Sequence, residues 1–184
     1  MWLEIFGAAS SLLYIFLEIK QRSSLWIVGF ISSAVYAVVF YQNGLYAFST
    51  LYVYYVAASV YGFYCWRFAQ KKNDTIERPV IRLRLQLGVI LAIISIALFA
   101  GIGYVLDRFT DSPNLPPYCE ALATALSIVA TWMLAQKILE QWLVWIFLNF
   151  FSSALYFWCG LYPTGALFLV YGIMSVTGWM KWRW

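Results

Sequence analysis

Seven long apolar stretches run along the chain, separated by short segments rich in polar or turn-forming residues. A stretch of about 17 residues in helical form reaches roughly 26 Å, enough to cross the hydrocarbon core of a bilayer. The breaks include Gly44 and Gly160, each able to take the positive φ of a tight turn, and a proline-rich segment at 111–117. The pattern predicts an all-α polytopic membrane protein with transmembrane helices over residues 3–19, 25–41, 45–67, 83–106, 119–136, 142–158 and 162–180.

Composition supports a membrane location. Hydrophobic residues make up 64% of the chain and charged residues 11%, with a mean hydropathy of +0.76. A soluble domain needs a far more polar surface than this, so the lipid bilayer is the expected surrounding. The net charge of +4 does not indicate a nucleic-acid partner, because the basic residues follow the membrane topology.

The positions of lysine and arginine predict the orientation. Basic residues such as Lys20, Arg67, Lys137 and Lys181 follow the first, third, fifth and seventh predicted helices, whereas only Arg108 falls on the opposite side. Cytoplasmic loops carry an excess of such residues. The sequence therefore predicts a multi-pass membrane protein with its N-terminus outside and its C-terminus inside.

The two ends of the chain repeat each other at a constant offset of 116 residues, without a gap. Matched positions include Glu4 and Glu120, Trp26 and Trp142, Tyr55 and Tyr171, Gly62 and Gly178, and Trp66 and Trp182. We expect a first three-helix repeat over 1–67, a basic linker and fourth helix over 68–118, and a second three-helix repeat over 119–184. The odd fourth helix makes the two repeats parallel, a plan that resembles the 3+1+3 arrangement of the SWEET sugar transporters.

The sequence excludes several chemistries. It contains no histidine, which removes Ser–His catalysis and histidine metal sites. Cys65, Cys119 and Cys159 lack metal-ligand spacing, and no phosphate loop or dinucleotide fingerprint is present. No catalytic residue, metal or cofactor is predicted, and an enzyme is the least favoured class. For Cys119 and Cys159, near the outer face, a disulfide is the alternative to inert packing.

Polar and aromatic residues form stripes along the predicted helices, most clearly within about 100° of the circumference of helix 142–158. The candidate substrate-binding residues are Trp142, Trp145, Asn149, Tyr156, Tyr36, Tyr55, Tyr171, Ser153, Ser33 and Ser127. A desolvated cation over an aromatic face gains up to about 2 kcal/mol. An amide near mid-membrane is costly unless paired, so Asn149 is interpreted as a ligand contact, with an interhelical clamp as the alternative. For Ser33, close helix packing is the stronger interpretation.

The segment Gln141 to Asn149 contains the pattern W-x-x-W-x-x-x-N. This pattern is similar to the signature of the Pnu family of vitamin transporters, and the preceding Ala125–Trp132 run and the following Gly160-Leu161-Tyr162 also resemble that family. The resemblance covers essentially the whole chain. It implies a SWEET-like bundle that takes up an unphosphorylated vitamin by facilitated diffusion, after which a cytoplasmic kinase traps the product. It also makes Trp142, Trp145 and Asn149 candidate substrate contacts.

The family divides by substrate into nicotinamide riboside, thiamine and riboflavin carriers. The segment from Leu161 to Tyr171 looks more like the thiamine-type members, so the sequence predicts thiamine as the substrate and nicotinamide riboside as the alternative. The physical chemistry fits either cation. A non-transporting binding or assembly module is the alternative from another class, and a homo-oligomer is left open.

Overall fold

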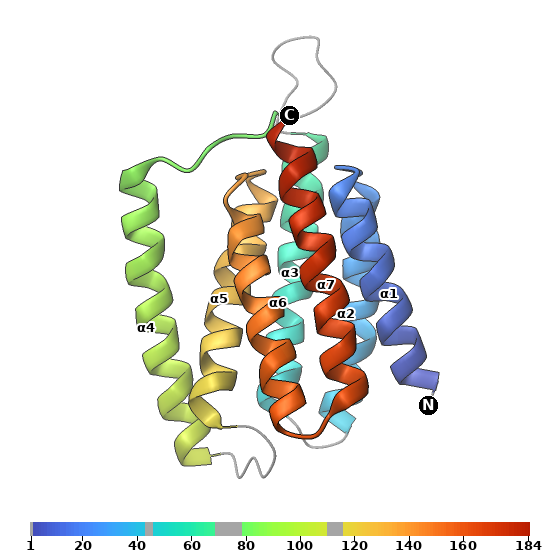
Figure 1. Cartoon of the computed structure of the whole chain (residues 1–184), viewed down its shortest axis with the longest axis vertical. Helices are drawn as coiled ribbons and strands as arrows, with labels where there is room; N and C mark the ends of the chain where they lie inside the picture. Colours follow the sequence, from blue (N-terminus) through green and yellow to red (C-terminus); the bar gives the residue numbers. More distant parts are fainter. Residues whose placement is uncertain (1, 43–45, 69–78, 110–115) are drawn as a thin grey trace. The chain divides into compact units, whose positions relative to one another are not determined.

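The structure is a computed structural model that describes residues 2–42, 46–68, 79–109 and 116–184. Within these ranges the chain forms seven α-helices and no strand longer than an isolated bridge (Figure 1). The helices are α1 (Trp2–Ile19), α2 (Ser24–Gln42), α3 (Tyr46–Arg67), α4 (Leu85–Phe109), α5 (Pro117–Ala135), α6 (Gln141–Trp158) and α7 (Tyr162–Arg183). The predicted all-α, seven-helix architecture is confirmed.

Contacts divide the chain into two compact units. Unit 1 comprises Met1–Val80 and Ala135–Lys137, and unit 2 comprises Ile81–Leu134 and Ile138–Trp184. In unit 1, α2 packs against both α1 and α3, and in unit 2, α6 packs against α7. The fourth helix belongs to unit 2, where Leu91 of α4 shares an apolar cluster with Val129 and Met133 of α5. The three-part division expected from the sequence stays a prediction.

Several described helices are suited to a bilayer. Three are long and apolar enough to cross it by themselves, namely Leu85–Arg108, Pro117–Ala135 and Tyr162–Arg183. In Leu85–Arg108, only 17% of the most apolar 18-residue stretch is buried. Side chains such as Ile93 and Ile96 are exposed. An apolar helix with an apolar exposed surface is stable where lipid, rather than water, surrounds it.

Helices α1 and α5 end in the same way, at positions related by the repeat offset. Gln21 has φ 55° and Lys137 has φ 54°. In each case the N–H of the next residue donates to the carbonyl five positions earlier, at 3.0 Å in both turns. This is the hydrogen bond of a Schellman motif, which usually places glycine at this position. A left-handed conformation costs a residue with a side chain about 1–2 kcal/mol.

The turn between α6 and α7 has the conformation predicted for it. Gly160 has φ 76°, and Leu161 N–H donates to the Tyr156 carbonyl at 2.9 Å. Glycine takes this left-handed conformation without steric cost. The matching Gly44 lies outside the described residues.

A tryptophan packs on a glycine at the same place in each repeat. The Trp26 ring lies against Gly62 in unit 1, and the Trp142 ring lies against Gly178 in unit 2, so closely that an added methyl group would overlap the ring. Each tryptophan also meets a second one edge-on: Trp26 and Trp66 have centroids 5.7 Å apart, and Trp142 and Trp182 have centroids 5.5 Å apart. The internal duplication therefore extends to side-chain packing.

One interhelical hydrogen bond is preserved although its donor has changed helix. In unit 1, Ser49 Oγ of α3 donates to the Ala37 carbonyl of α2 at 2.9 Å. In unit 2, Ser153 Oγ of α6 donates to the Gly165 carbonyl of α7 at 2.8 Å. By the 116-residue offset, Ala37 matches Ser153 and Ser49 matches Gly165. Each helix pair thus has a hydroxyl-to-carbonyl bond at the same level, as close packing of membrane helices favours.

Candidate functional site

The polar centre of unit 2 is a chain of hydrogen bonds between α6 and α7. Asn149, 7% exposed, donates from Nδ2 to Ser175 Oγ at 3.1 Å. Ser175 Oγ donates in turn to the Tyr171 carbonyl at 2.8 Å. Among the described residues this is the one hydrogen bond of the Asn149 side chain, whose amide also offers a second proton and a carbonyl oxygen. Asn149 therefore joins two helices and still has groups with which to bind a polar ligand.

Aromatic rings form a corner on the same two helices. The Phe168 ring lies 5.1 Å from Tyr156 and 5.7 Å, nearly edge-on, from Tyr171. Both tyrosines were candidates from the sequence, whereas Phe168 was not. A usable signal existed, because Phe168 precedes Tyr171 by one helical turn and matches Tyr52, which precedes Tyr55 in the same way. Such π faces attract cations, most strongly where water is excluded.

The two tryptophans of the motif have different surroundings. Trp142 is fully buried between Gly178 and Trp182, so its ring is part of the helix packing. Trp145 is half-buried and lies one turn before Asn149. Within the described ranges, neither indole N–H has a hydrogen-bond partner. A buried donor without an acceptor costs about 1–3 kcal/mol, which a ligand oxygen at Trp145 would recover.

Two predicted serines of unit 2 lie apart from this arrangement. Ser153 is buried and its hydroxyl is used in the bond to the Gly165 carbonyl. Ser127 of α5 is half-buried, and its carbonyl accepts the Thr131 hydroxyl at 2.8 Å. The contacts recorded among the described residues do not join either serine to the Asn149 chain. The structure thus brings together Asn149, Tyr156 and Tyr171, with Ser175 and Phe168 as added neighbours.

Unit 1 carries a tyrosine cluster of its own. Tyr36 lies 5.3 Å from Tyr52, and Tyr52 meets Tyr55 edge-on at 5.8 Å. The pair Tyr52 and Tyr55 matches Phe168 and Tyr171, so both units share this edge-on ring pair. The third ring differs, because Tyr36 matches Ser152 rather than Tyr156. Ser33, the position that matches Asn149, is buried. Tyr36 and Tyr55 are therefore brought together through Tyr52, which the sequence analysis did not select.

The described residues offer few side chains that could bind a metal ion together. They contain no group of three or more Asp, Glu or Cys side chains placed to hold a metal ion. Cys65, Cys119 and Cys159 are all free, so the disulfide considered for the last two is not formed. The recorded site chemistry is that of amides, hydroxyls and aromatic rings.

These features define an all-α membrane protein whose two units carry aromatic rings at matching positions of the internal duplication, and duplicated membrane folds are common among carriers of small molecules. A family model described as "Nicotinamide mononucleotide transporter" matches residues 1–184. The chain belongs to this family of membrane vitamin transporters, which confirms the resemblance to the Pnu family.

Individual relatives agree with this placement. The nicotinamide riboside transporter PnuC of Escherichia coli (strain K12) is 24% identical over 202 residues, covering 98% of this chain and 84% of that protein. The transporter of the same name from Neisseria mucosa is 24% identical over 190 residues, covering 98% of this chain and 72% of that protein. A solved structure titled "Crystal structure of the Vitamin B3 transporter PnuC" has a TM-score of 0.75 and 24% identity over 99% of this chain and 80% of its own. This last likeness shows a shared fold.

Proposed function

We propose that this protein carries nicotinamide riboside across the bacterial cytoplasmic membrane by facilitated diffusion, and that phosphorylation in the cytoplasm traps the product. The curated relatives support this substrate, because those from Escherichia coli, Neisseria mucosa and Haemophilus influenzae are all named nicotinamide riboside transporters. The alternative from the sequence is thus better supported than thiamine, which the comparisons do not favour.

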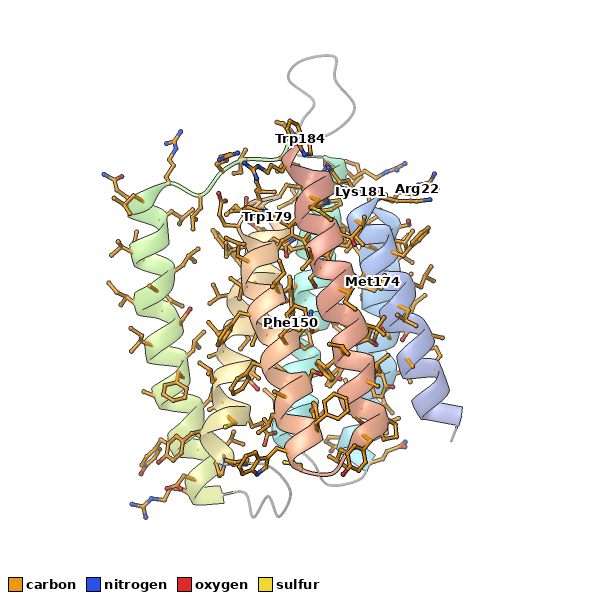
Figure 2. All side chains as sticks on the ribbon, in the orientation of Figure 1. Arg22, Phe150, Met174, Trp179, Lys181 and Trp184 are labelled. Atoms are coloured by element: carbon orange, nitrogen blue, oxygen red, sulfur yellow. The ribbon has the colours of Figure 1, made fainter. Side chains whose placement is uncertain are left out.

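The charges of α6 and α7 favour an unphosphorylated substrate. Helix α6 contains no charged residue, and the basic residues of α7, Lys181 and Arg183, lie in its last turn. Lys181 and Trp184 are seen at that end of the helix in Figure 2. A phosphate group carries about two negative charges at neutral pH and is bound through Arg, Lys or several N–H donors. The Asn149 site offers a neutral amide and hydroxyls instead, so it suits a riboside better than a mononucleotide.

The Asn149 chain and the adjoining aromatic corner carry the proposal. Nicotinamide riboside combines a pyridinium cation with a carboxamide and a ribose. The rings of Phe168 and Tyr171 offer faces for the cation. The free amide groups of Asn149 and the unpartnered indole N–H of Trp145 offer partners for the carboxamide or the ribose hydroxyls.

A ligand panel tests the substrate directly. Purified protein is expected to be stabilised against heat by nicotinamide riboside, because a ligand that binds only the folded state raises its stability. Nicotinamide mononucleotide, thiamine and riboflavin are expected to have little effect at equal concentration. Proteoliposomes should exchange labelled nicotinamide riboside without an imposed proton or sodium gradient. Stabilisation and exchange with thiamine, but not with nicotinamide riboside, would return the assignment to thiamine.

The proposed orientation, N-terminus outside and C-terminus inside, has its own test. Leu161 in the α6–α7 turn and Lys181 near the chain end are both exposed. In a background where Cys65, Cys119 and Cys159 are serine, a membrane-impermeant thiol reagent should label Leu161→Cys in whole cells, and Lys181→Cys only after lysis. The reverse result would mean that the chain is inserted the other way round.

A further inference from the structure

A buried lysine lies at the turn between α5 and α6. Lys137 is 2% exposed, although lysine is almost never fully buried unless its charge is paired. Its Nζ lies 4.5 Å from the ring centroid of Trp66 and donates to Gln21 Oε1 at 3.4 Å. All three residues belong to unit 1. A desolvated cation is attracted to the electron-rich face of a tryptophan ring, which offsets part of the cost of burial.

Other residues near Lys137 also tie the α5–α6 turn to unit 1. Gln136 Nε2 donates to the Tyr61 hydroxyl at 2.6 Å. Glu18 of α1, 3% exposed, adds a second buried charged residue to this unit. The segment Ala135–Lys137 is thus grouped with unit 1, whereas the rest of α5 and all of α6 belong to unit 2.

The next residues of the turn have their partners in unit 2. Leu139 N–H donates to the Ile81 carbonyl at 2.9 Å. Glu140 Oε2 accepts the N–H of Leu83 at 2.7 Å. The turn therefore changes partners after Lys137, whose positive φ is a strained conformation for a residue with a side chain.

The two residues in contact occupy equivalent positions of the two repeats. Gln21 and Lys137 are separated by the repeat offset of 116 residues and share the same unusual backbone conformation. Two lysines here would repel each other, and two glutamines would leave no cation for Trp66. Strained backbone that persists with side chains other than glycine is characteristic of functional and switch regions.

We propose that the contact of Lys137 with Gln21 and Trp66 is a latch that opens and closes during transport. The inference rests on the proposed transport function. Carriers built from paired repeats work largely by rocking one repeat against the other, and the α5–α6 turn holds its contact with Gln21 and Trp66 through a strained backbone. Polar and cation–π contacts such as these can separate and re-form, unlike a packed apolar core.

Reversible crosslinking tests whether this contact must open. The protein is the Gln21→Cys/Lys137→Cys variant, with the native cysteines changed to serine, treated with a short bis-thiosulfonate reagent in proteoliposomes. The crosslinked protein is expected to bind nicotinamide riboside as before but to exchange it at least about tenfold more slowly, because the conformational step is blocked. Reduction of the crosslink should restore exchange. The matched control, Tyr64→Cys/Phe68→Cys, links two exposed positions one turn apart on α3 and should leave exchange unchanged.

Each other result has a distinct meaning. Equal exchange with and without the crosslink would overturn the latch, and so would a reversible loss of binding together with exchange, which would assign the contact to the site itself. Failure of the uncrosslinked protein to exchange nicotinamide riboside would instead contradict the proposed function.

Charge variants give a second measurement if the cysteine pair does not fold. Lys137→Met keeps the length without the charge and is expected to change the exchange rate about threefold or more at unchanged affinity, whereas Lys137→Arg should retain it. Equal rates for all three proteins would also overturn the latch.

Discussion

Replacing Asn149 by leucine is expected to weaken nicotinamide riboside binding about tenfold to a hundredfold. Leucine keeps the size of the side chain but removes every donor and acceptor, so a bound ligand would lose its partner at a cost of roughly 1–3 kcal/mol, at 1.4 kcal/mol per decade. The protein should still fold, because a leucine next to Ser175 leaves that hydroxyl bonded to the Tyr171 carbonyl. Isothermal titration of the purified variant measures the change.

Ser175→Ala is the matched control. It removes the acceptor of Asn149 Nδ2 and leaves the amide itself in place. If the amide contacts the ligand, this variant should bind within about threefold of the native protein, since a typical interhelical hydrogen bond in a membrane contributes about 0.6 kcal/mol. If Asn149 only clamps the two helices together, both substitutions should lower the melting temperature by the same amount. Both variants should then bind nicotinamide riboside normally once they are stabilised.

Gly178→Ala is expected to destabilise the protein by about 1–3 kcal/mol, the usual cost of overpacking a closely packed site. An added methyl group would overlap the Trp142 ring, and Trp142 is itself fixed against Trp182. Gly62→Ala should act in the same direction, because Trp26 and Trp66 repeat this packing in unit 1. Thermal unfolding in detergent, followed by tryptophan fluorescence, measures both.

Gly101→Ala provides the comparison. Gly101 also lies within a helix but has no other group within 4 Å of the added methyl, so alanine should be neutral or stabilise by about 0.5–1 kcal/mol through its higher helix propensity. Equal melting temperatures for Gly178→Ala and Gly101→Ala would show that the Trp142 ring moves aside without cost.

The helices could be predicted from the sequence because lipid solvation demands long apolar segments with satisfied backbones. Their ends were harder. The fourth helix was expected to begin at Leu83, but α4 begins at Leu85, and the Leu83 N–H before it donates to Glu140, 57 positions along the chain. A bond of that range leaves no trace in local hydropathy. The end of α5 was expected at Gln136 and lies at Ala135, but the left-handed conformation of Lys137 just beyond it was hidden, because glycine is the usual signal there.

The sequence predicted which helix faces carry the candidate site, but not which residues contact each other across the helices. Helical periodicity places Trp145 and Asn149 on one face, yet it does not say which residue of α7 Asn149 meets. Ser175 was not among the candidate residues, and in the structure its hydroxyl accepts the Asn149 amide proton. Phe168 was passed over because phenylalanine in a membrane helix is ordinary. Its importance appears only from its contacts with the rings of both Tyr156 and Tyr171.

The serine donor lies on α3 in unit 1 but on α6 in unit 2. This difference constrains how the two halves of the gene can recombine. A crossover within a helix pair that joined α2 to α7 would bring Ala37 opposite Gly165, with no hydroxyl at that level, whereas joining α6 to α3 would bring Ser153 opposite Ser49, with two. Only exchange of a whole helix pair keeps one hydroxyl donor in each pair. Descendants of this duplication should therefore inherit α2 with α3, and α6 with α7, as undivided blocks.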